Sequence, residues 1–98
     1  MLLSFRKMFE SIFKQKLYRA KKQIIKKFEF VGYKVEKTSG VFHLQAFRNG
    51  EIRKIRIVLG EISEEDRKKV KEYTVSTPIK REIWCLLSSG QFKVEVVE

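Results

Sequence analysis

A β-hairpin between Val41 and Leu59 constrains the fold more than any other stretch of this 98-residue chain. Asn49-Gly50 separates two runs that are rich in β-branched and aromatic residues. Both central positions of a type I′ turn need a positive φ, which Asn and Gly tolerate. A two-residue loop also fixes the register, so Arg48 should face Glu51 and each outer pair follows by counting.

The register assigns the side chains of the hairpin to two faces. A one-residue slip would exchange the faces, so burial of the apolar one should hold the register. We expect the apolar face to bury Phe42, Leu44, Ile55 and Ile57, with Ala46 opposite Arg53 near the turn. The opposite face, called the polar face of the hairpin below, carries His43, Gln45, Lys54, Arg56 and Val58.

The positive charge of the chain is concentrated at its N-terminal end. Residues 1–29 hold nine Lys and Arg against two Glu, a charge of +7, whereas residues 30–98 hold thirteen against ten, a charge of +3. Such a basic field attracts nucleic-acid phosphates or an anionic lipid surface. A solvated helix face that keeps a small protein soluble has the same composition, so both interpretations stay open.

The N-terminal region predicts one long basic amphipathic helix over residues 1–29. Apolar positions follow the helical period from Ser4 to about Phe28, without Gly or Pro, and Lys and Arg fill the other faces. Some 25 residues span roughly 37 Å at 1.5 Å per residue, which is longer than so small a domain needs. The half nearer the sheet should pack on it through Leu17, Ala20, Ile24 and Phe28.

The first half of this helix carries an apolar stripe made of Phe5, Met8, Phe9, Ile12 and Phe13. A stripe of this size is too apolar to leave exposed. It either belongs to the domain's own core, after a break that folds the helix back, or it meets a partner. The first candidate partner is a second copy of the chain, and the second is a membrane surface into which the apolar stripe would insert.

The rest of the chain predicts short elements that form a single domain over residues 1–98. Gly32 ends the helical region and residues 31–36 alternate as a strand. Ser63 caps a second helix, which carries few apolar residues and which Pro78 should stop. Residues 82–88 predict a buried strand and residues 91–96 an edge strand. The fold class is therefore α+β, in the order α-β-β-β-α-β-β.

Cys85 is the one cysteine, so an internal disulfide is excluded. It lies in an apolar run, where a buried small side chain is the expected role, and a reducing, cytoplasmic setting is the default. The N-terminal stretch is interrupted by Arg6, Lys7 and Glu10 and lacks a small-residue cleavage site. It predicts neither a signal peptide nor a membrane span.

Three strand sequences carry a family resemblance. Phe30-Val31-Gly32-Tyr33-Lys34-Val35 is similar to a GF-x-V strand, Phe42-His43-Leu44-Gln45-Ala46 to an x-D-L-x-A strand and Ile55-Arg56-Ile57-Val58 to an I-E-V-K strand. With this order of elements, residues 31–97 resemble the restriction-endonuclease-like (PD-(D/E)XK) nuclease core, most closely the small archaeal Holliday-junction resolvases. The resemblance implies a mixed central sheet with a helical crossover.

The residues that carry catalysis in that family are replaced here. The resemblance puts His43 at the Asp position, Arg56 at the Glu position and Val58 at the Lys position. In the active family, carboxylates bind a divalent cation that polarises the phosphate. An arginine repels such a cation, so we expect no nuclease activity, no catalytic residue, no metal and no cofactor. A lone histidine also completes neither a zinc site nor a triad.

Three functional hypotheses follow. The first is a catalytically inactive, nuclease-like protein that binds nucleic acid, DNA rather than RNA, through the phosphate contacts of Lys21, Lys22, Lys26, Lys27, His43, Lys54 and Arg56. The second is an interaction or assembly protein that forms a homodimer or docks a partner through the apolar stripe. The third is an enzyme with an unrecognised site, whose Mg²⁺- or Mn²⁺-dependent cleavage would need His43.

Overall fold

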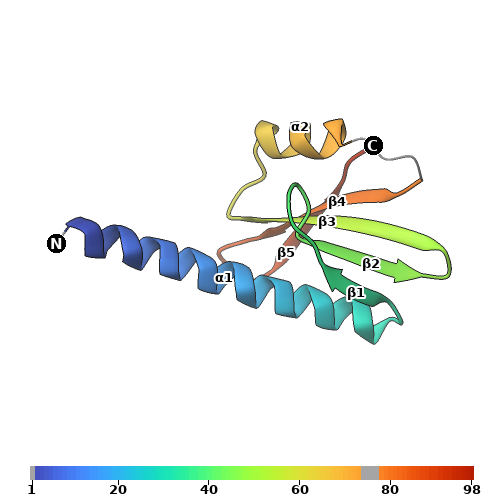
Figure 1. Ribbon diagram of the computed structural model, residues 1–98, viewed down its shortest axis with the longest axis horizontal. Coiled ribbons are helices and arrows are strands. Elements are labelled where there is room, and N and C mark those ends of the chain that lie inside the picture. The colour runs from blue at the N-terminus through green and yellow to red at the C-terminus, as the bar shows by residue number, and fades with distance from the viewer. Residues whose placement is uncertain (1, 74–77) are drawn as a thin grey trace.

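A computed structural model describes the backbone of residues 2–73 and 78–98 and the side chains of residues 7–73 and 78–98. The fold is α+β, and the element order α-β-β-β-α-β-β confirms the prediction. The elements are α1 (Leu2–Phe30), β1 (Lys34–Lys37), β2 (Leu44–Arg48), β3 (Glu51–Leu59), α2 (Glu64–Glu72), β4 (Lys80–Leu86) and β5 (Phe92–Val96) (Figure 1).

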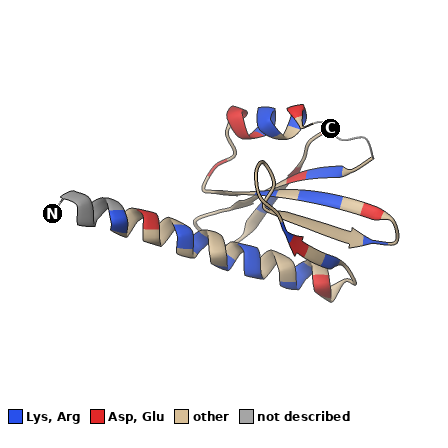
Figure 2. Cartoon of the chain, viewed as in Figure 1, with Lys and Arg blue, Asp and Glu red and all other residues tan. Residues whose placement is uncertain are grey.

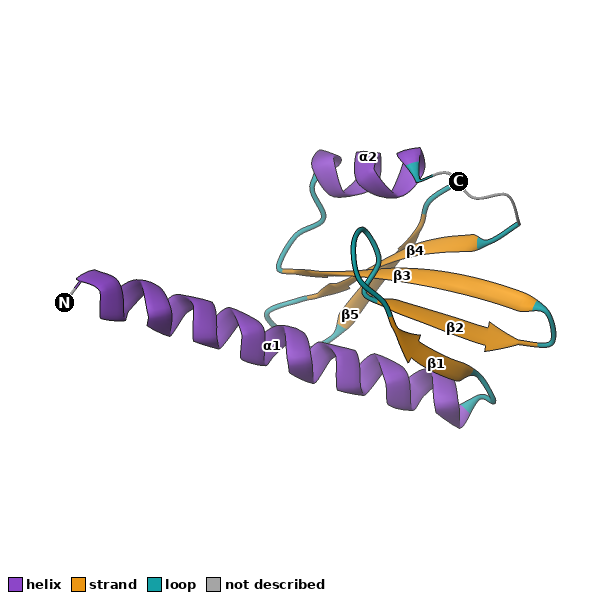
Figure 3. Ribbon diagram, in the orientation of Figure 1, coloured by secondary structure: helices purple, strands orange, loops and turns teal. Residues whose placement is uncertain are grey.

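The five strands form one mixed sheet in the order β1-β2-β3-β4-β5. β1, β2 and β3 are an antiparallel meander, α2 crosses over to β4, which is parallel to β3, and β5 returns antiparallel to β4 (Figure 3). No further strand of the described residues pairs with β1 or β5, so these two strands form the edges of the sheet.

The hairpin forms with the predicted register. Arg48 pairs with Glu51 and Leu44 pairs with Ile55. Asn49 and Gly50 have φ values of 49° and 78°, as a type I′ turn requires. Local turn chemistry therefore sets the pairing of β2 with β3.

The expectation that Phe42 shares a face with Leu44 is wrong, because the strand ladder becomes irregular at His43. The His43 N–H donates to the Ile55 carbonyl at 2.8 Å, one residue out of register with the pairs that follow. The strict alternation of side chains therefore ends before Phe42, whose ring packs against Tyr73 at a centroid distance of 4.9 Å. Phe42 belongs to the hydrophobic cluster under α2.

Two hydrophobic clusters hold the helices to the sheet. Ala20, Ile24 and Phe28 of α1 are buried, and the cluster under α1 also contains Tyr33, Leu44, Ala46, Ile55 and Ile57. Leu17 is packed against this cluster, so the four predicted contact residues of α1 are confirmed. The cluster under α2 contains Phe42, Ile62, Val70, Ile83 and Cys85, which confirms that Cys85 is buried.

The boundaries of several elements differ from the sequence prediction. Val31 and Gly32 form the turn after α1, where Gly32 has a φ of 90° and the Tyr33 N–H donates to the Phe28 carbonyl, so β1 begins only at Lys34. Ser63 caps α2 as expected, in a reciprocal capping box with Asp66. α2 ends at Glu72, before Pro78, because Tyr73 is already extended. Residues 74–77 lie outside the described residues.

α1 continues unbroken past the sheet (Figure 1). We call residues 2–16 the overhang. Its described side chains, from Lys7 on, are all exposed, with Met8 at 59% and Phe13 at 56% of their full accessible surface. The alternative in which the apolar stripe joins the domain's own core is therefore wrong for Met8, Phe9, Ile12 and Phe13, while the side chain of Phe5 lies outside the description. No helix in the described part of the chain is long and apolar enough to cross a membrane.

Candidate nucleic-acid interface

Arg56, at the predicted phosphate-binding face, is held inside the protein. Its Nε donates to Asp66 Oδ1 at 3.0 Å and its Nη1 donates to the Val41 carbonyl at 2.8 Å. Its side chain keeps only 16% of its accessible surface. Arg56 therefore joins β3 to α2 and to the loop before β2. Most of the hydrogen-bond donors of its guanidinium are engaged in these contacts.

His43 also has a structural partner. Its Nδ1 accepts a hydrogen bond of 2.8 Å from the Ile57 N–H, a position that a backbone carbonyl fills in a regular ladder. The hydrogen bond needs an unprotonated Nδ1, so Nε2 carries the proton of the neutral ring. Burial, with the nearby positive charges of Lys21 and Arg56, lowers the pKa of His43 below its usual 6.5. The ring is therefore neutral at pH 7 and brings no positive charge to a phosphate.

Lys54 and Val58, two more residues of the polar face, also contribute to the fold. Lys54 lies 5.2 Å from the Tyr73 ring centroid and 5.9 Å from that of Phe42. Val58 packs against the cluster under α2. Arg56, Lys54 and Val58 thus share the α2 side of β3, while His43 lies where the pairing of β2 with β3 becomes irregular. The described residues contain no group of three or more His, Cys, Asp or Glu that could hold a metal ion.

The cations of α1 are arranged differently from those of the rest of the chain. Six ion pairs are present among the described side chains: Arg53–Glu82, Arg56–Asp66, Arg67–Glu64, Arg67–Glu95, Lys69–Glu65 and Lys80–Glu51. None of them involves a residue of α1, although its residues 7–30 hold eight Lys and Arg against two Glu. Figure 2 shows these basic residues repeating along the helix. The positive charge along residues 7–30 is therefore not neutralised by ion pairs with other described side chains.

The predicted lysines of α1 lie on different sides of the helix. Lys21 is half-buried, whereas Lys22, Lys26 and Lys27 are exposed. Lys22 lies over the Tyr18 ring, 4.9 Å from its centroid. Because residues three and four apart share a helix face, one row points away from the buried residues Ala20, Ile24 and Phe28. This row, the outer cations, consists of Arg19, Lys22 and Lys26.

Sequence reasoning missed Arg19, although its spacing from Lys22 and Lys26 was available. It also missed the buried carboxylate of Glu82, which is 1% exposed, accepts from the Arg53 guanidinium and accepts from Trp84 Nε1 at 3.0 Å. The hydrogen bond to Glu82 raises the pKa of Arg53 further. Glu82 lies in a mostly apolar run. The neighbouring sequence therefore gives no sign that its carboxylate pairs with Arg53 of the adjacent strand.

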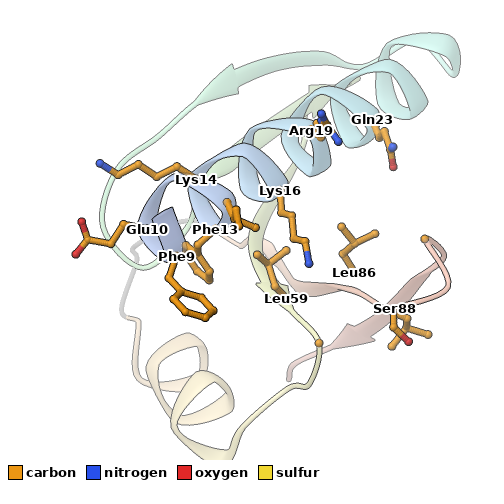
Figure 4. Close-up of a pocket in the computed structure, with 14 residues that line it drawn as sticks. Phe9, Glu10, Phe13, Lys14, Lys16, Arg19, Gln23, Leu59, Leu86 and Ser88 are labelled. Atoms are coloured by element: carbon orange, nitrogen blue, oxygen red, sulfur yellow. The ribbon is translucent and has the colours of Figure 1, made fainter. Parts of the chain in front are cut away.

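A groove of about 910 Å³ lies between the overhang and the adjacent end of the sheet. Figure 4 shows Phe9 and Phe13 on the side of α1 that faces Leu59, with Lys16 reaching toward Leu59 and Leu86. Its floor is apolar, and three cations, Lys14, Lys16 and Arg19, line it together with Glu10 as the acidic residue. The groove thus combines an apolar interior with a mostly basic rim.

No protein-family model matches this chain, and no curated protein matches it either. The function is therefore argued from the geometry and charge of the described residues.

Proposed function

We propose that this protein binds nucleic acid through the outer face of α1, as a member of the nuclease-like fold without catalytic activity. The observation that supports this function is the contrast in charge pairing. The six ion pairs of the described side chains all lie outside α1, so the cations of α1 are available to an external polyanion. A stripe of Lys and Arg along one helix is the electrostatic pattern with which proteins bind nucleic-acid phosphates.

The proposal assigns the binding surface to Arg19, Lys22 and Lys26, with Lys27 beside them, instead of to the polar face of the hairpin. Arg56 is bound to Asp66, Lys54 is half-buried whereas Lys22 is exposed, and His43 is neutral. The same contacts argue against a catalytic role for His43, because Nδ1 is occupied by the Ile57 N–H. Binding is therefore expected to depend on the phosphate backbone and to tolerate any base sequence.

The shape of the surface favours duplex DNA. The outer cations span about 10 Å along a single exposed helix. The major groove of B-form DNA, about 12 Å wide, admits an α-helix, whereas the major groove of A-form RNA is deep and narrow. A helix that lies along one side of the body and continues past it can approach such a groove without displacing the sheet (Figure 1).

The test is a salt titration of binding, followed by fluorescence anisotropy, to duplex DNA, a four-way DNA junction, single-stranded DNA and duplex RNA. We expect the tightest binding for the DNA duplexes, with little dependence on sequence. The logarithm of the association constant should fall steeply with the logarithm of salt, by about 0.9 for each neutralised phosphate. Absence of binding to every one of these nucleic acids at low salt would contradict the proposal.

A triple variant locates the surface. Arg19→Ala, Lys22→Ala and Lys26→Ala together should reduce the salt slope by about 2 to 3. The matched control removes three exposed lysines outside α1, at Lys34, Lys68 and Lys71, and changes the net charge equally. The control should leave most of the slope in place. Equal slopes for both triple variants would show that the surface is not the outer face of α1.

A second candidate function is supported by the exposed apolar side chains of the overhang. We propose that the groove beside Phe9 and Phe13 docks a helical segment of another protein with an apolar face and acidic flanks. Charge selects this occupant, because the groove is lined by Lys14, Lys16 and Arg19 with one Glu. A second copy of the overhang, itself basic, fits this rim poorly.

This docking can be tested with two synthetic amphipathic helices that share a leucine face and carry either glutamate or lysine elsewhere. The Leu/Glu peptide should bind and the Leu/Lys peptide should not, as measured by fluorescence anisotropy. Ile12→Glu should abolish the binding, because Ile12 lines the groove and is 46% exposed. Binding of neither peptide, or binding that Ile12→Glu leaves unchanged, would exclude this candidate.

A further inference from the structure

The open edge of β5 exposes backbone groups in a defined pattern. The Val97 N–H donates to the Arg81 carbonyl and the Leu87 N–H donates to the Gln91 carbonyl, both across the β4–β5 pair. Hydrogen-bonded positions alternate in an antiparallel pair, so the odd-numbered residues of β5 bond to β4. The N–H and C=O groups of Phe92, Val94 and Val96 therefore point away from the sheet, at an edge with no neighbouring strand.

The side chains of β5 fall into a charged and an apolar face. Glu95 contacts Arg67 of α2 at 2.8 Å, which places Glu95 and Lys93 on the α2 side. Val94 and Val96 alternate onto the other side, where they remain 44% and 61% exposed. α1 packs against β1 and β3 on that side and leaves this pair of valines largely uncovered.

The sequence of β5, Phe-Lys-Val-Glu-Val, is complementary to itself in the antiparallel direction. A two-fold axis through Val94 would pair its outward backbone groups with those of the same residue in a second copy. Lys93 would then face Glu95 of the second copy on one side of the sheet, and Glu95 would face Lys93. On the other side, Phe92 would face Val96 of the second copy, which adds two apolar pairs.

We propose that two copies of this chain pair through β5 and form one continuous ten-stranded sheet. The occupant of the edge is a second copy because the register that pairs the outward backbone groups also pairs opposite charges and exposed valines. Unpaired N–H and C=O groups on an exposed edge favour such addition of a strand. This contact uses neither the outer cations nor the overhang, so it is independent of the proposed nucleic-acid binding.

Charge reversal tests the pairing, with sedimentation equilibrium at about 0.15 M salt as the measurement. The unmodified protein should dimerise as its concentration rises. In the Lys93→Glu variant, the new glutamate of each copy would face Glu95 of the other copy, which gives two like-charged pairs. This should weaken association by about tenfold or more. Adding Glu95→Lys to that variant removes the ion pair with Arg67 but restores opposite charges across the contact, and it should therefore restore the dimer at least in part. Lys34→Glu, the same change on the β1 edge, is the control and should leave association unchanged.

A second measurement needs no variant. The N–H groups of Val94 and Val96 have no strand beside them in a single copy, so hydrogen exchange should be fast in dilute solution and slow at concentrations where the dimer forms. Three results would overturn the proposal: a monomer at every concentration, fast exchange at these amides in the concentrated protein, or a dimer that survives Lys93→Glu. Loss of the dimer on Ile12→Glu but not on Lys93→Glu would assign the contact to the overhang instead.

Discussion

The sheet with α2 and the long helix α1 differ in how their positive charges are paired. In the sheet and α2, five of the thirteen Lys and Arg have a carboxylate partner, and these include Arg53 with Glu82 and Arg56 with Asp66. Among the described side chains, none of the eight Lys and Arg in residues 7–30 of α1 has an ion-pair partner. Part of the positive charge of the sheet and α2 is therefore used in ion pairs within the fold, whereas no ion pair of the described side chains uses a cation of α1.

The same contrast exists within α1 itself. Ile24 is completely buried against the sheet, whereas Ile12, on the overhang, is 46% exposed. One helix thus has a segment that contributes to the stability of the domain and a segment that does not. The predictions below test this division, starting from the largest expected effect.

Ile24→Ala should destabilise the protein by about 2 to 5 kcal/mol, because it removes packed apolar atoms from the cluster under α1 and leaves a cavity. Ile12→Ala makes the same chemical change on the same helix and should alter the free energy of unfolding by no more than about 0.5 kcal/mol. Chemical denaturation followed by circular dichroism measures both. A large loss for Ile12→Ala would mean that the overhang is part of the folding unit.

Glu82→Gln should cost about 2 kcal/mol, since the buried carboxylate that accepts from Arg53 and Trp84 becomes a neutral amide. Glu29→Gln, at an exposed position of α1, is the matched control and should change stability by less than about 0.5 kcal/mol. Thermal unfolding at pH 7 compares the two. Similar losses for both variants would remove the distinction between paired and unpaired charges.

The neutral ring of His43 should make the free energy of unfolding depend on pH. Its pKa is lowered in the folded protein, so the unfolded chain binds the proton more readily, and the stabilisation present above pH 6.5 is lost as the pH falls below 6.5. Unfolding free energies at pH 7 and pH 5 should therefore differ more for the unmodified protein than for His43→Gln. The lowered pKa values of Asp66 and Glu51 act at more acidic pH in both proteins. An equal pH dependence would show that His43 is not held neutral.

The sequence was sufficient where structure is decided locally. Asn49-Gly50 predicts the register of the hairpin, and Ser63 predicts the start of α2, because a turn and a cap depend on a few adjacent residues. The element order follows from such local signals along the chain, whereas the mixed sheet was expected from the family resemblance. The family resemblance in the strands stays a prediction.

The sequence was insufficient where a side chain finds its partner across the fold. The pairing of Arg56 with Asp66 joins residues on β3 and α2, and Glu82 meets Arg53 across the β3–β4 pair. Strand alternation also gave the wrong face for Phe42, because a hydrogen bond from the Ile57 amide to the His43 ring replaces a ladder contact. Such contacts depend on the assembled sheet, so the cations that remain free could be identified only from the structure.

The central claim is that α1, and not the polar face of the hairpin, contacts nucleic acid. The most direct test is the change in backbone amide chemical shifts, in ¹H–¹⁵N NMR spectra, as a short DNA duplex is added to the full-length protein. The account predicts that the largest changes occur in residues 19–27 of α1, around the outer cations. The largest changes around His43, Lys54 and Arg56, or no change along α1 at low salt, would contradict it.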